Sequence, residues 1–208
     1  MPHADQVRNH ARWRPGWAPG RTSYAWLLGL SDQSGLRYLV NEYQRALQDL
    51  PGFDLVPLEW MHILVQEAGF TDELDDAAVE PMVAAVRSRL AGMSPPALAF
   101  HHALVLPESL SLPAEPQSSL HELRAAVRSA LAEALGTDAV PAEPEDSDKH
   151  VNLAHSTTEG PAIFAVATLS ATVVEPTTAK VPALSLVRLS RDHSTSEWEV
   201  VTEVPFGG

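Results

Sequence analysis

The sequence contains no cysteine and no long apolar run. The absence of cysteine excludes disulfide bonds, thiolate nucleophiles and sulfur-ligated zinc. No apolar stretch approaches the roughly 18 residues that a bilayer-spanning helix needs. Residues 1–5 (MPHAD) also lack the basic and apolar regions of a secretory signal peptide. We therefore expect a cytoplasmic protein without a membrane partner.

Basic residues are few: 14 Lys and Arg stand against 27 Asp and Glu, and the net charge is −13. Because phosphate contacts dominate affinity for nucleic acids, this balance disfavours long nucleic acids as partners. Four of the basic residues nevertheless fall within the first 21 positions, a grouping that suits one small anionic ligand: Arg8, Arg12, Arg14 and Arg21. The nine histidines show no HExxH or HxH spacing, so we expect neither a metal site nor a cofactor.

The 208 residues are 45% hydrophobic and can bury a core as one domain or as two closely packed lobes. Apolar residues at helical spacing predict helices at 34–50, 77–90, 116–135 and 161–169, and Thr71 with Glu73 or Asp72 is expected to cap the second of them. Apolar runs predict strands at 24–30, 58–66, 97–106, 110–112, 171–175, 181–190 and 197–204, with another that begins at His150. Since these strands need not be parallel, the fold class is α+β.

Two short apolar segments are each led by a histidine, residues 62–65 (HILV) and 150–153 (HVNL). They lie 88 positions apart (150 minus 62), one in each half of the chain, and each follows a helix and a loop, which hints at a duplication. If the halves face each other, the two imidazoles converge on one cleft. Histidine suits an exchange of protons because its ordinary pKa, roughly 6.5, lies near working pH. We therefore expect His62 and His150 to be an acid and base pair, with either one as the base.

The amino-acid sequence around these histidines resembles that of the 2H phosphoesterases. The stretches that carry the resemblance are 13–21 (WRPGWAPGR), 56–62 (VPLEWMH), 69–73 (GFTDE) and 187–193 (VRLSRDH). Together they look like the actinobacterial branch of the 2'-5' RNA ligase-like proteins. The resemblance implies two pseudo-symmetric lobes, each an antiparallel sheet with outer helices, around a central cleft. It also implies one bilobal domain over 1–208, in which 1–22 form an arm and about 23–100 and about 101–208 contribute to the lobes.

The family motif is His-x-Ser/Thr-x, present twice, and the resemblance implies that it acts without metal on 2',3'-cyclic or 2'-5' phosphodiesters. Positions i and i+2 of a strand share a face, so each histidine would point into the cleft with a hydroxyl that donates to phosphoryl oxygens. In this chain the i+2 positions hold Leu64, which cannot donate, and Asn152, whose amide can donate. Two such changes are expected to weaken phosphoryl chemistry, because losing one donor costs about 10²–10³ in rate.

Three functions remain open. The first is a phosphodiesterase or ligase-like enzyme with altered phosphate contacts, acting on a small nucleotide or RNA end. The second is an acid-base enzyme of specialised metabolism (an isomerase, cyclase or hydrolase) that handles a small molecule without phosphate. The third is a non-catalytic binding protein, which would leave both histidines unexplained.

Further candidate contacts come from the arm and from the two histidine strands. The arm is expected to fold over the cleft, where Arg12, Arg14 or Arg21 grips an anion and Trp13 or Trp17 stacks on a ring. Along the first strand, regular alternation places Gln66 on the same face as His62, within reach of substrate. His155, just beyond the second motif, adds a polar group to the same region. The oligomeric state is left open.

Overall fold

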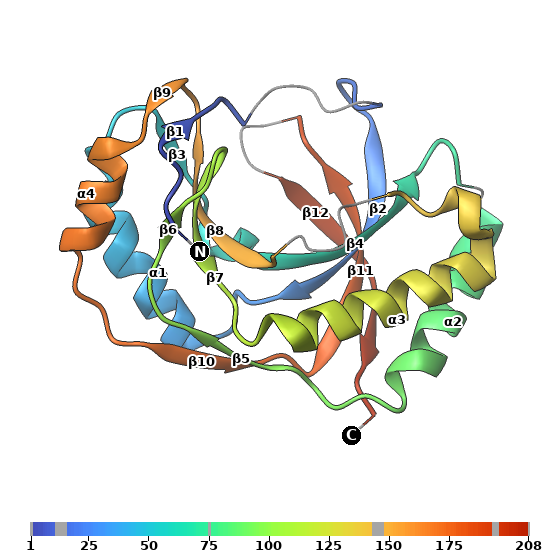
Figure 1. The fold of residues 1–208 in the computed structure, drawn as a ribbon. Helices are drawn as coiled ribbons and strands as arrows, with labels where there is room; N and C mark the ends of the chain where they lie inside the picture. Colours follow the sequence, from blue (N-terminus) through green and yellow to red (C-terminus); the bar gives the residue numbers. More distant parts are fainter. Residues whose placement is uncertain (1, 11–15, 75, 143–147, 193–195, 208) are drawn as a thin grey trace.

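The computed structural model describes residues 2–10, 16–74, 76–142, 148–192 and 196–207. Two four-stranded antiparallel sheets form the framework, and each takes strands from both halves of the chain (Figure 1). The first sheet has the strand order β12-β11-β2-β4, made of β12 (Glu197–Pro205), β11 (Ala183–Ser190), β2 (Thr22–Gly29) and β4 (His62–Phe70). The second has the order β3-β8-β7-β6, made of β3 (Phe53–Leu55), β8 (His150–Ser156), β7 (Ser109–Pro113) and β6 (Leu104–Val105).

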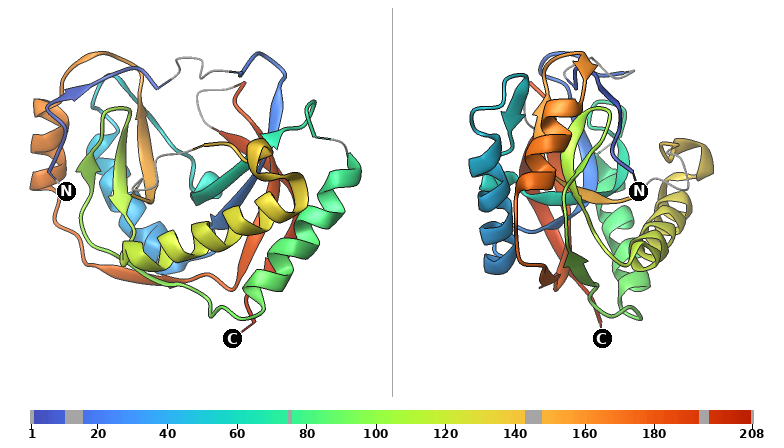
Figure 2. Two further views of the ribbon diagram at one scale, coloured as in Figure 1. Left: turned by 45° about the vertical axis from the view of Figure 1, so that its right-hand side comes forward. Right: turned by 60° about the vertical axis from the view of Figure 1, so that its left-hand side comes forward.

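Helices cover the outer sides of the two sheets (Figure 2). α1 (Ser34–Leu47) and α4 (Ile163–Ala171) pack on the second sheet, whereas α2 (Val79–Leu90) and α3 (Gln117–Leu135) pack on the first. The apolar stripes predicted for α1, α2 and α3 are their buried faces, as amphipathic helices require. The α+β class with outer helices is therefore confirmed. None of the helices in the described part of the chain could span a bilayer.

The first sheet is apolar on both of its faces. Trp26 and Leu28 of β2 belong to the large core that lies under the helices. The alternate residues of the same sheet form a separate inner cluster, made of Ala25, Leu27, Val187 and Leu189, with Trp17, Leu64 and Trp198 packed against it. Side chains alternate across a strand, so this inner cluster faces away from the helices. The first sheet thus presents an apolar inner face.

Several predicted elements have different bounds. The strand expected at 97–106 is two strands, because β5 (Ala97–Phe100) pairs with β10 (Thr177–Lys180) whereas β6 pairs with β7. At the break, Ala103 N donates to the Tyr43 hydroxyl of α1. The strand expected at 171–175 is wrong, since α4 continues to Ala171 and Thr172 Oγ1 caps its end by donating to the Thr168 carbonyl.

The helix cap expected at Thr71 is also wrong. Thr71 Oγ1 donates to the Thr22 carbonyl across the sheet edge, at 3.2 Å. A short 3-10 helix (Asp76–Ala78) then leads into α2, which begins only at Val79. Two further 3-10 helices, Leu58–Trp60 and Thr137–Ala139, precede β4 and follow α3.

Backbone hydrogen bonds hold residues near the beginning of the chain against the second sheet. β1 (Gln6–Val7) pairs with β9 (Gly160–Pro161), and backbone hydrogen bonds continue on both sides of this pair. Arg8 N donates to the Pro107 carbonyl at 2.7 Å, and His10 N donates to the Ser156 carbonyl at 2.8 Å. These bonds bring His10 to the end of β8.

Candidate active site

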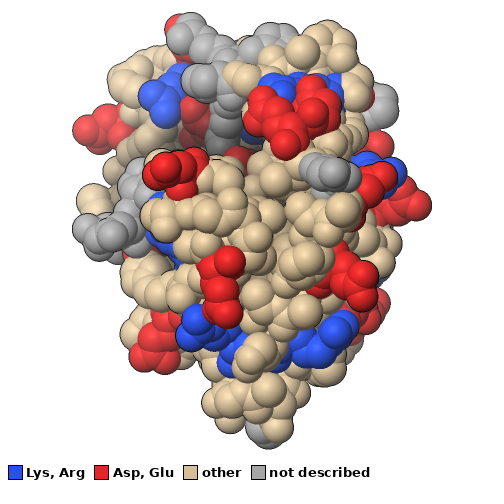
Figure 3. Space-filling model, turned by 90° about the vertical axis from the view of Figure 1, so that its right-hand side faces the viewer, with Lys and Arg blue, Asp and Glu red and all other residues tan. Residues whose placement is uncertain are grey.

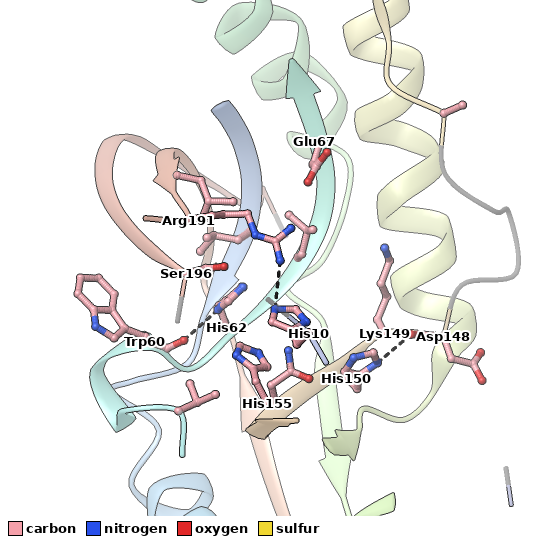
Figure 4. Close-up of a pocket in the computed structure, with 16 residues that line it drawn as sticks. His10, Trp60, His62, Glu67, Asp148, Lys149, His150, His155, Arg191 and Ser196 are labelled. Atoms are coloured by element: carbon pink, nitrogen blue, oxygen red, sulfur yellow. Dashed lines mark hydrogen bonds between the residues drawn. The ribbon is translucent and has the colours of Figure 1, made fainter. Parts of the chain in front are cut away.

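A cavity of about 470 Å³ lies between the two sheets (Figure 4). Three side chains of β4 line it, His62, Leu64 and Glu67, and three side chains of β8 line it from the other side, His150, Asn152 and His155. The two sets occupy the same relative positions i, i+2 and i+5 along their strands. The convergence of the two predicted histidines on one cavity is therefore observed in the structure.

A β-bulge at the same relative position of each strand creates this spacing. In β4, Leu64 is opposite Leu27 and Gln66 is opposite Trp26, so Val65 is the extra residue. In β8 the register shifts in the same way: Asn152 and Ala154 are each opposite a residue of β7, and Leu153 between them is the extra residue. A bulge inserts one residue and resets the alternation of faces. The i+5 residues, Glu67 and His155, therefore turn toward the cavity in place of the i+4 residues.

The bulge makes the placement expected for Gln66 wrong. Gln66 shares a register position with the core residue Trp26 and is fully buried (0% exposed). Its side chain accepts a hydrogen bond from Arg124 Nε at 3.3 Å and donates to the Pro141 carbonyl at 3.2 Å. Gln66 thus joins β4 to α3 and to the loop that follows it, and Glu67 occupies the cavity position.

Both cavity histidines are oriented in the same way. His62 Nδ1 lies 2.9 Å from the Trp60 carbonyl, and His150 Nδ1 lies 3.1 Å from the Asp148 carbonyl, in each case the residue two positions earlier (Figure 4). A carbonyl can only accept, so Nδ1 carries the proton in each neutral ring. Nε2 is then the basic atom of both imidazoles. Such a fixed tautomer is the arrangement that a general base requires.

Burial lowers the pKa of both half-buried imidazoles below its ordinary value. For His62 the cause is loss of hydration, which the Trp60 carbonyl opposes in part. For His150 loss of hydration is again the largest cause, and the positive charges of Lys149 and His62 lower the pKa further. The last contribution shows that the two imidazoles sense each other electrostatically. Burial therefore favours the neutral form of both rings.

We expect stability to fall as the pH is lowered from about 6.5, the pKa of histidine in an unfolded chain. Below that pH both histidines are protonated in the unfolded chain but not in the folded protein, because their pKa values are lower there. The free energy of unfolding therefore decreases with falling pH. Melting temperatures of the wild type and of His62→Gln and His150→Gln, measured between pH 5.5 and 7.5, test this. Each variant should lose less stability across the window; parallel curves would contradict the expectation.

The two i+2 residues give the cavity unlike walls. Leu64 continues the apolar inner face of the first sheet. Opposite it, Asn152 Oδ1 accepts a hydrogen bond from Ser111 Oγ at 2.8 Å, and Ser111 Oγ lies 2.8 Å from Ser109 Oγ. Because Ser111 uses its one proton on Asn152, Ser109 must donate to Ser111. This chain fixes the amide so that its N–H₂ group is the part of Asn152 left to donate.

A group of charged and aromatic side chains around the histidines is not predictable from the sequence motifs. Lining the cavity beside the predicted residues are His10, Trp60, Asp148, Lys149, Arg191 and Ser196, all labelled in Figure 4. Lys149 and Asp148 directly precede His150, so a wider window around that motif would have included them. Arg191 lies within the stretch 187–193 that carries the resemblance, but nothing in the sequence indicates that it meets His10, because only the fold brings His10 to the end of β11. His155, which was predicted, stacks on His10 with ring centroids 4.0 Å apart.

The predicted arm residues have different outcomes. Arg12, Trp13 and Arg14 lie outside the described residues. The expectation that Arg21 grips a ligand is not supported by its position, because its guanidinium pairs with Asp72 at 2.8 Å and with Glu73, and stacks 3.6 Å over the Phe70 ring. These carboxylates raise the pKa of Arg21.

Trp17 is placed on the inner apolar cluster of the first sheet. Its ring meets the edge of Phe70, with centroids 5.2 Å apart, and the Arg191 guanidinium lies 5.6 Å from its centroid. It therefore flanks the cavity side of the first sheet. No group of three or more His, Asp or Glu side chains among the described residues is arranged to hold a metal ion.

The sequence matches no protein-family model, and a search of curated proteins finds no match. Solved structures are similar in fold. The protein TT0787 of Thermus thermophilus superposes with a TM-score of 0.66 at 21% identity, over 90% of this chain and 98% of that chain. Escherichia coli LigT in complex with 3'-AMP gives 0.59 at 10% identity, over 90% and 99%. A protein solved as a phosphoesterase gives 0.56 at 11% identity, over 90% and 99%. The chain therefore has the two-lobed fold of LigT, which is the fold that its resemblance to the 2H phosphoesterases implies.

Proposed function

We propose that this protein is a 2H-type phosphodiesterase that acts on a 2',3'-cyclic or 2'-5' phosphodiester of a small nucleotide or RNA end. His62 and His150 are its acid and base, and both lobes form one catalytic domain. The observation that carries the proposal is the matched orientation of the two imidazoles, each with Nδ1 tied to the carbonyl two residues earlier and Nε2 left for chemistry. The placement in the actinobacterial branch of the 2'-5' RNA ligase-like proteins rests on the sequence resemblance alone.

The structural neighbours support a small phosphorylated ligand. E. coli LigT has been solved with 3'-AMP, with ATP and with phosphate, and its fold is shared over 90% of this chain in each of those complexes. The surface supports a small ligand as well. On the face in Figure 3, acidic and basic side chains are mixed over most of the surface and the basic ones gather only in a short row near its lower end, so the described residues form no long basic track there. Long nucleic acids need such a track.

The proposed chemistry uses each imidazole once. Nε2 of one neutral histidine takes a proton from the attacking water, whose oxygen forms a bond to phosphorus. The other histidine, protonated at Nε2, gives its proton to the sugar oxygen as the ring P–O bond breaks. A cyclic phosphate and water thus become a phosphomonoester, with atoms and charge balanced. The amide of Asn152 donates to a non-bridging oxygen, where charge accumulates in the transition state.

The test is hydrolysis of 2',3'-cyclic nucleotides and 2'-5' dinucleotides in the presence of EDTA. We expect the monoester product to form at the same rate with and without the chelator, because neither histidine needs a metal to exchange its proton. The matched control substrates are 3'-5' dinucleotides, which lack both linkages and are expected to be poor substrates. No turnover of any cyclic or 2'-5' substrate, from protein shown to be folded, would contradict the proposal.

One observation favours a second candidate function. Leu64, Leu27 and Leu189 make one wall of the cavity apolar, and a phosphate group gains nothing from such a wall. An acid-base enzyme for a small metabolite without phosphate would use the same two histidines with this wall. The two candidates differ in whether the cavity binds phosphate, so phosphate affinity discriminates between them.

A further inference from the structure

We infer that Arg191, held in place by His10, is a phosphoryl-binding residue of this cavity. It takes the role that a hydroxyl at position 64 would have had. The inference rests on the proposed function for its substrate, a phosphodiester, but it concerns binding and is tested without turnover. Neither residue belongs to a histidine motif, and they come from opposite ends of the chain.

The contact that carries the inference joins the arm to β11. Arg191 Nη2 donates to His10 Nε2 at 3.1 Å (Figure 4). A guanidinium can only donate, so His10 Nε2 must be an unprotonated acceptor and the proton of the neutral ring lies on Nδ1. That atom lies 3.5 Å from Glu108 Oε2, which accounts for the tautomer. The carboxylate thereby orients the imidazole, and the imidazole orients the guanidinium.

His10 is itself rigidly placed. Its backbone N–H is bonded to the Ser156 carbonyl at the end of β8, and its ring stacks on His155 with an interplanar angle of 20°. Glu108 is held in turn by Arg8, whose Nε donates to Oε1 at 2.9 Å. These contacts fix residues 8–10, and His10 in turn holds Arg191 in place. A binding residue that is already ordered loses little conformational entropy when its ligand arrives.

The chemistry of this end of the cavity suits a phosphoryl group. A guanidinium presents parallel N–H donors that match two oxygens of a phosphate, and its charge makes each bond stronger than one from a neutral hydroxyl. His155 and the amide of Asn152 lie on the β8 side, and Lys149 adds a second cation to the lining. Two carboxylates, Glu67 and Asp148, line the same cavity, so the inference rests on the fixed position of Arg191 beside His10 and not on the charge of the cavity as a whole.

The test titrates inorganic phosphate into the wild type and into Arg191→Gln, by calorimetry at constant ionic strength. Loss of a charged, bidentate contact is expected to raise the Kd for phosphate by about 10- to 100-fold. Arg188→Gln is the matched control: Arg188 lies on β11, three residues before Arg191, but is exposed and 3.9 Å from Glu199, so its variant should bind phosphate as the wild type does. An unchanged Kd in Arg191→Gln would overturn the inference.

The role of His10 is tested with His10→Phe and His10→Asn. Phenylalanine keeps the ring that stacks on His155 but lacks the acceptor, so it should raise the Kd for phosphate; asparagine restores an acceptor and should recover part of the loss. A His10→Phe protein that binds phosphate normally would remove His10 as a positioning residue. Acetate in place of phosphate distinguishes a carboxylate site: if acetate binds as tightly as phosphate, the site is not a phosphoryl site.

A second readout separates this inference from the proposed function. If cyclic phosphodiesters are turned over, Arg191→Ala should be slow, and millimolar guanidinium should restore part of its rate, which a merely structural defect would not allow. Normal phosphate affinity in Arg191→Gln, with turnover intact in the wild type, would defeat the inference and leave the function standing. Weakened phosphate binding in Arg191→Gln, with no turnover in the wild type, would support the role of Arg191 and contradict the proposed function.

Discussion

Replacing His62 or His150 with alanine is expected to lower kcat for a cyclic phosphodiester by about 10²–10⁴-fold in each single variant, the usual range for loss of a general acid or base. The physical reason is the shared geometry. Each ring offers Nε2 as its reactive atom because Nδ1 is occupied by a carbonyl, and each faces the same cavity. The measurement is kcat for both variants under saturating substrate.

Two comparisons sharpen this expectation. Because the acid and the base act in one transition state, the double variant should be little slower than the slower single variant. His121→Gln is the matched control, since His121 lies on α3 and does not line the cavity, and it should retain full turnover. Turnover within a few-fold of the wild type in either single variant would remove that histidine from the mechanism.

Much of the fold follows from local apolar patterns. The 3.6-residue spacing of apolar side chains predicted α1, α3 and the buried face of α2, and these helices differ from the expected ranges mainly at their ends. Continuous apolar runs predicted β2 and β11, which lie side by side at the centre of the first sheet. Most residues of both strands are buried and apolar residues predominate in them, so the signal is strong.

The site could be predicted only in part, and the bulges explain why. Regular alternation correctly gives i and i+2 on one face, which is how the cavity positions of Leu64 and Asn152 were expected. One extra residue, Val65 in β4 and Leu153 in β8, moves the next cavity position from i+4 to i+5. Nothing in either residue type marks a bulge, since both are ordinary apolar strand residues. Regular alternation therefore puts Gln66 on the wrong face and gives Glu67 no place in the cavity, where the structure has it.

The pairing of His10 with Arg191 lay beyond the sequence for a different reason. The two residues are separated by 181 positions, and no periodicity connects an irregular arm to a strand end. Their contact depends on β1 pairing with β9, which holds the residues just before His10 against the second sheet. Pairing of two-residue strands has almost no local signature, because so few side chains take part. A sequence can show that its first residues are rich in arginine and tryptophan, but not which part of the folded chain they contact.

β4 and β8 have the same backbone design but place different side chains in the cavity. The backbone repeats one design in β4 and β8: a histidine, a second residue at i+2 and a third at i+5. The side chains at the later positions differ, with Leu64 and Glu67 on one wall and Asn152 and His155 on the other. In the proposed reaction, the neutral donor to the phosphoryl group is therefore Asn152 on the β8 wall, and the charged donor is Arg191.

Replacing Asn152 with leucine is accordingly expected to lower kcat by about 10²–10³-fold, the cost of losing one donor to a developing oxyanion. The amide is fixed by Ser111 and Ser109, so Ser111→Ala should lower kcat by a smaller factor, because the donor is then present but no longer oriented. Asn152→Ser keeps a donor at the same position and should retain more activity than the leucine variant. The measurement is kcat for the three variants, with phosphate Kd as a check on binding.

The reciprocal change is Leu64→Thr, which adds a hydroxyl to the apolar wall and should raise kcat if the cavity handles a phosphodiester. Leu64 is half-buried beside His62, so a threonine side chain fits without enlarging the residue, and its hydroxyl can share the face of the imidazole. If Asn152→Leu keeps the kcat of the wild type and Leu64→Thr does not raise it, side chains at the i+2 positions do not donate to a charged oxygen in the transition state. The second candidate function, acid-base chemistry on a metabolite without phosphate, would then be the one that this cavity supports.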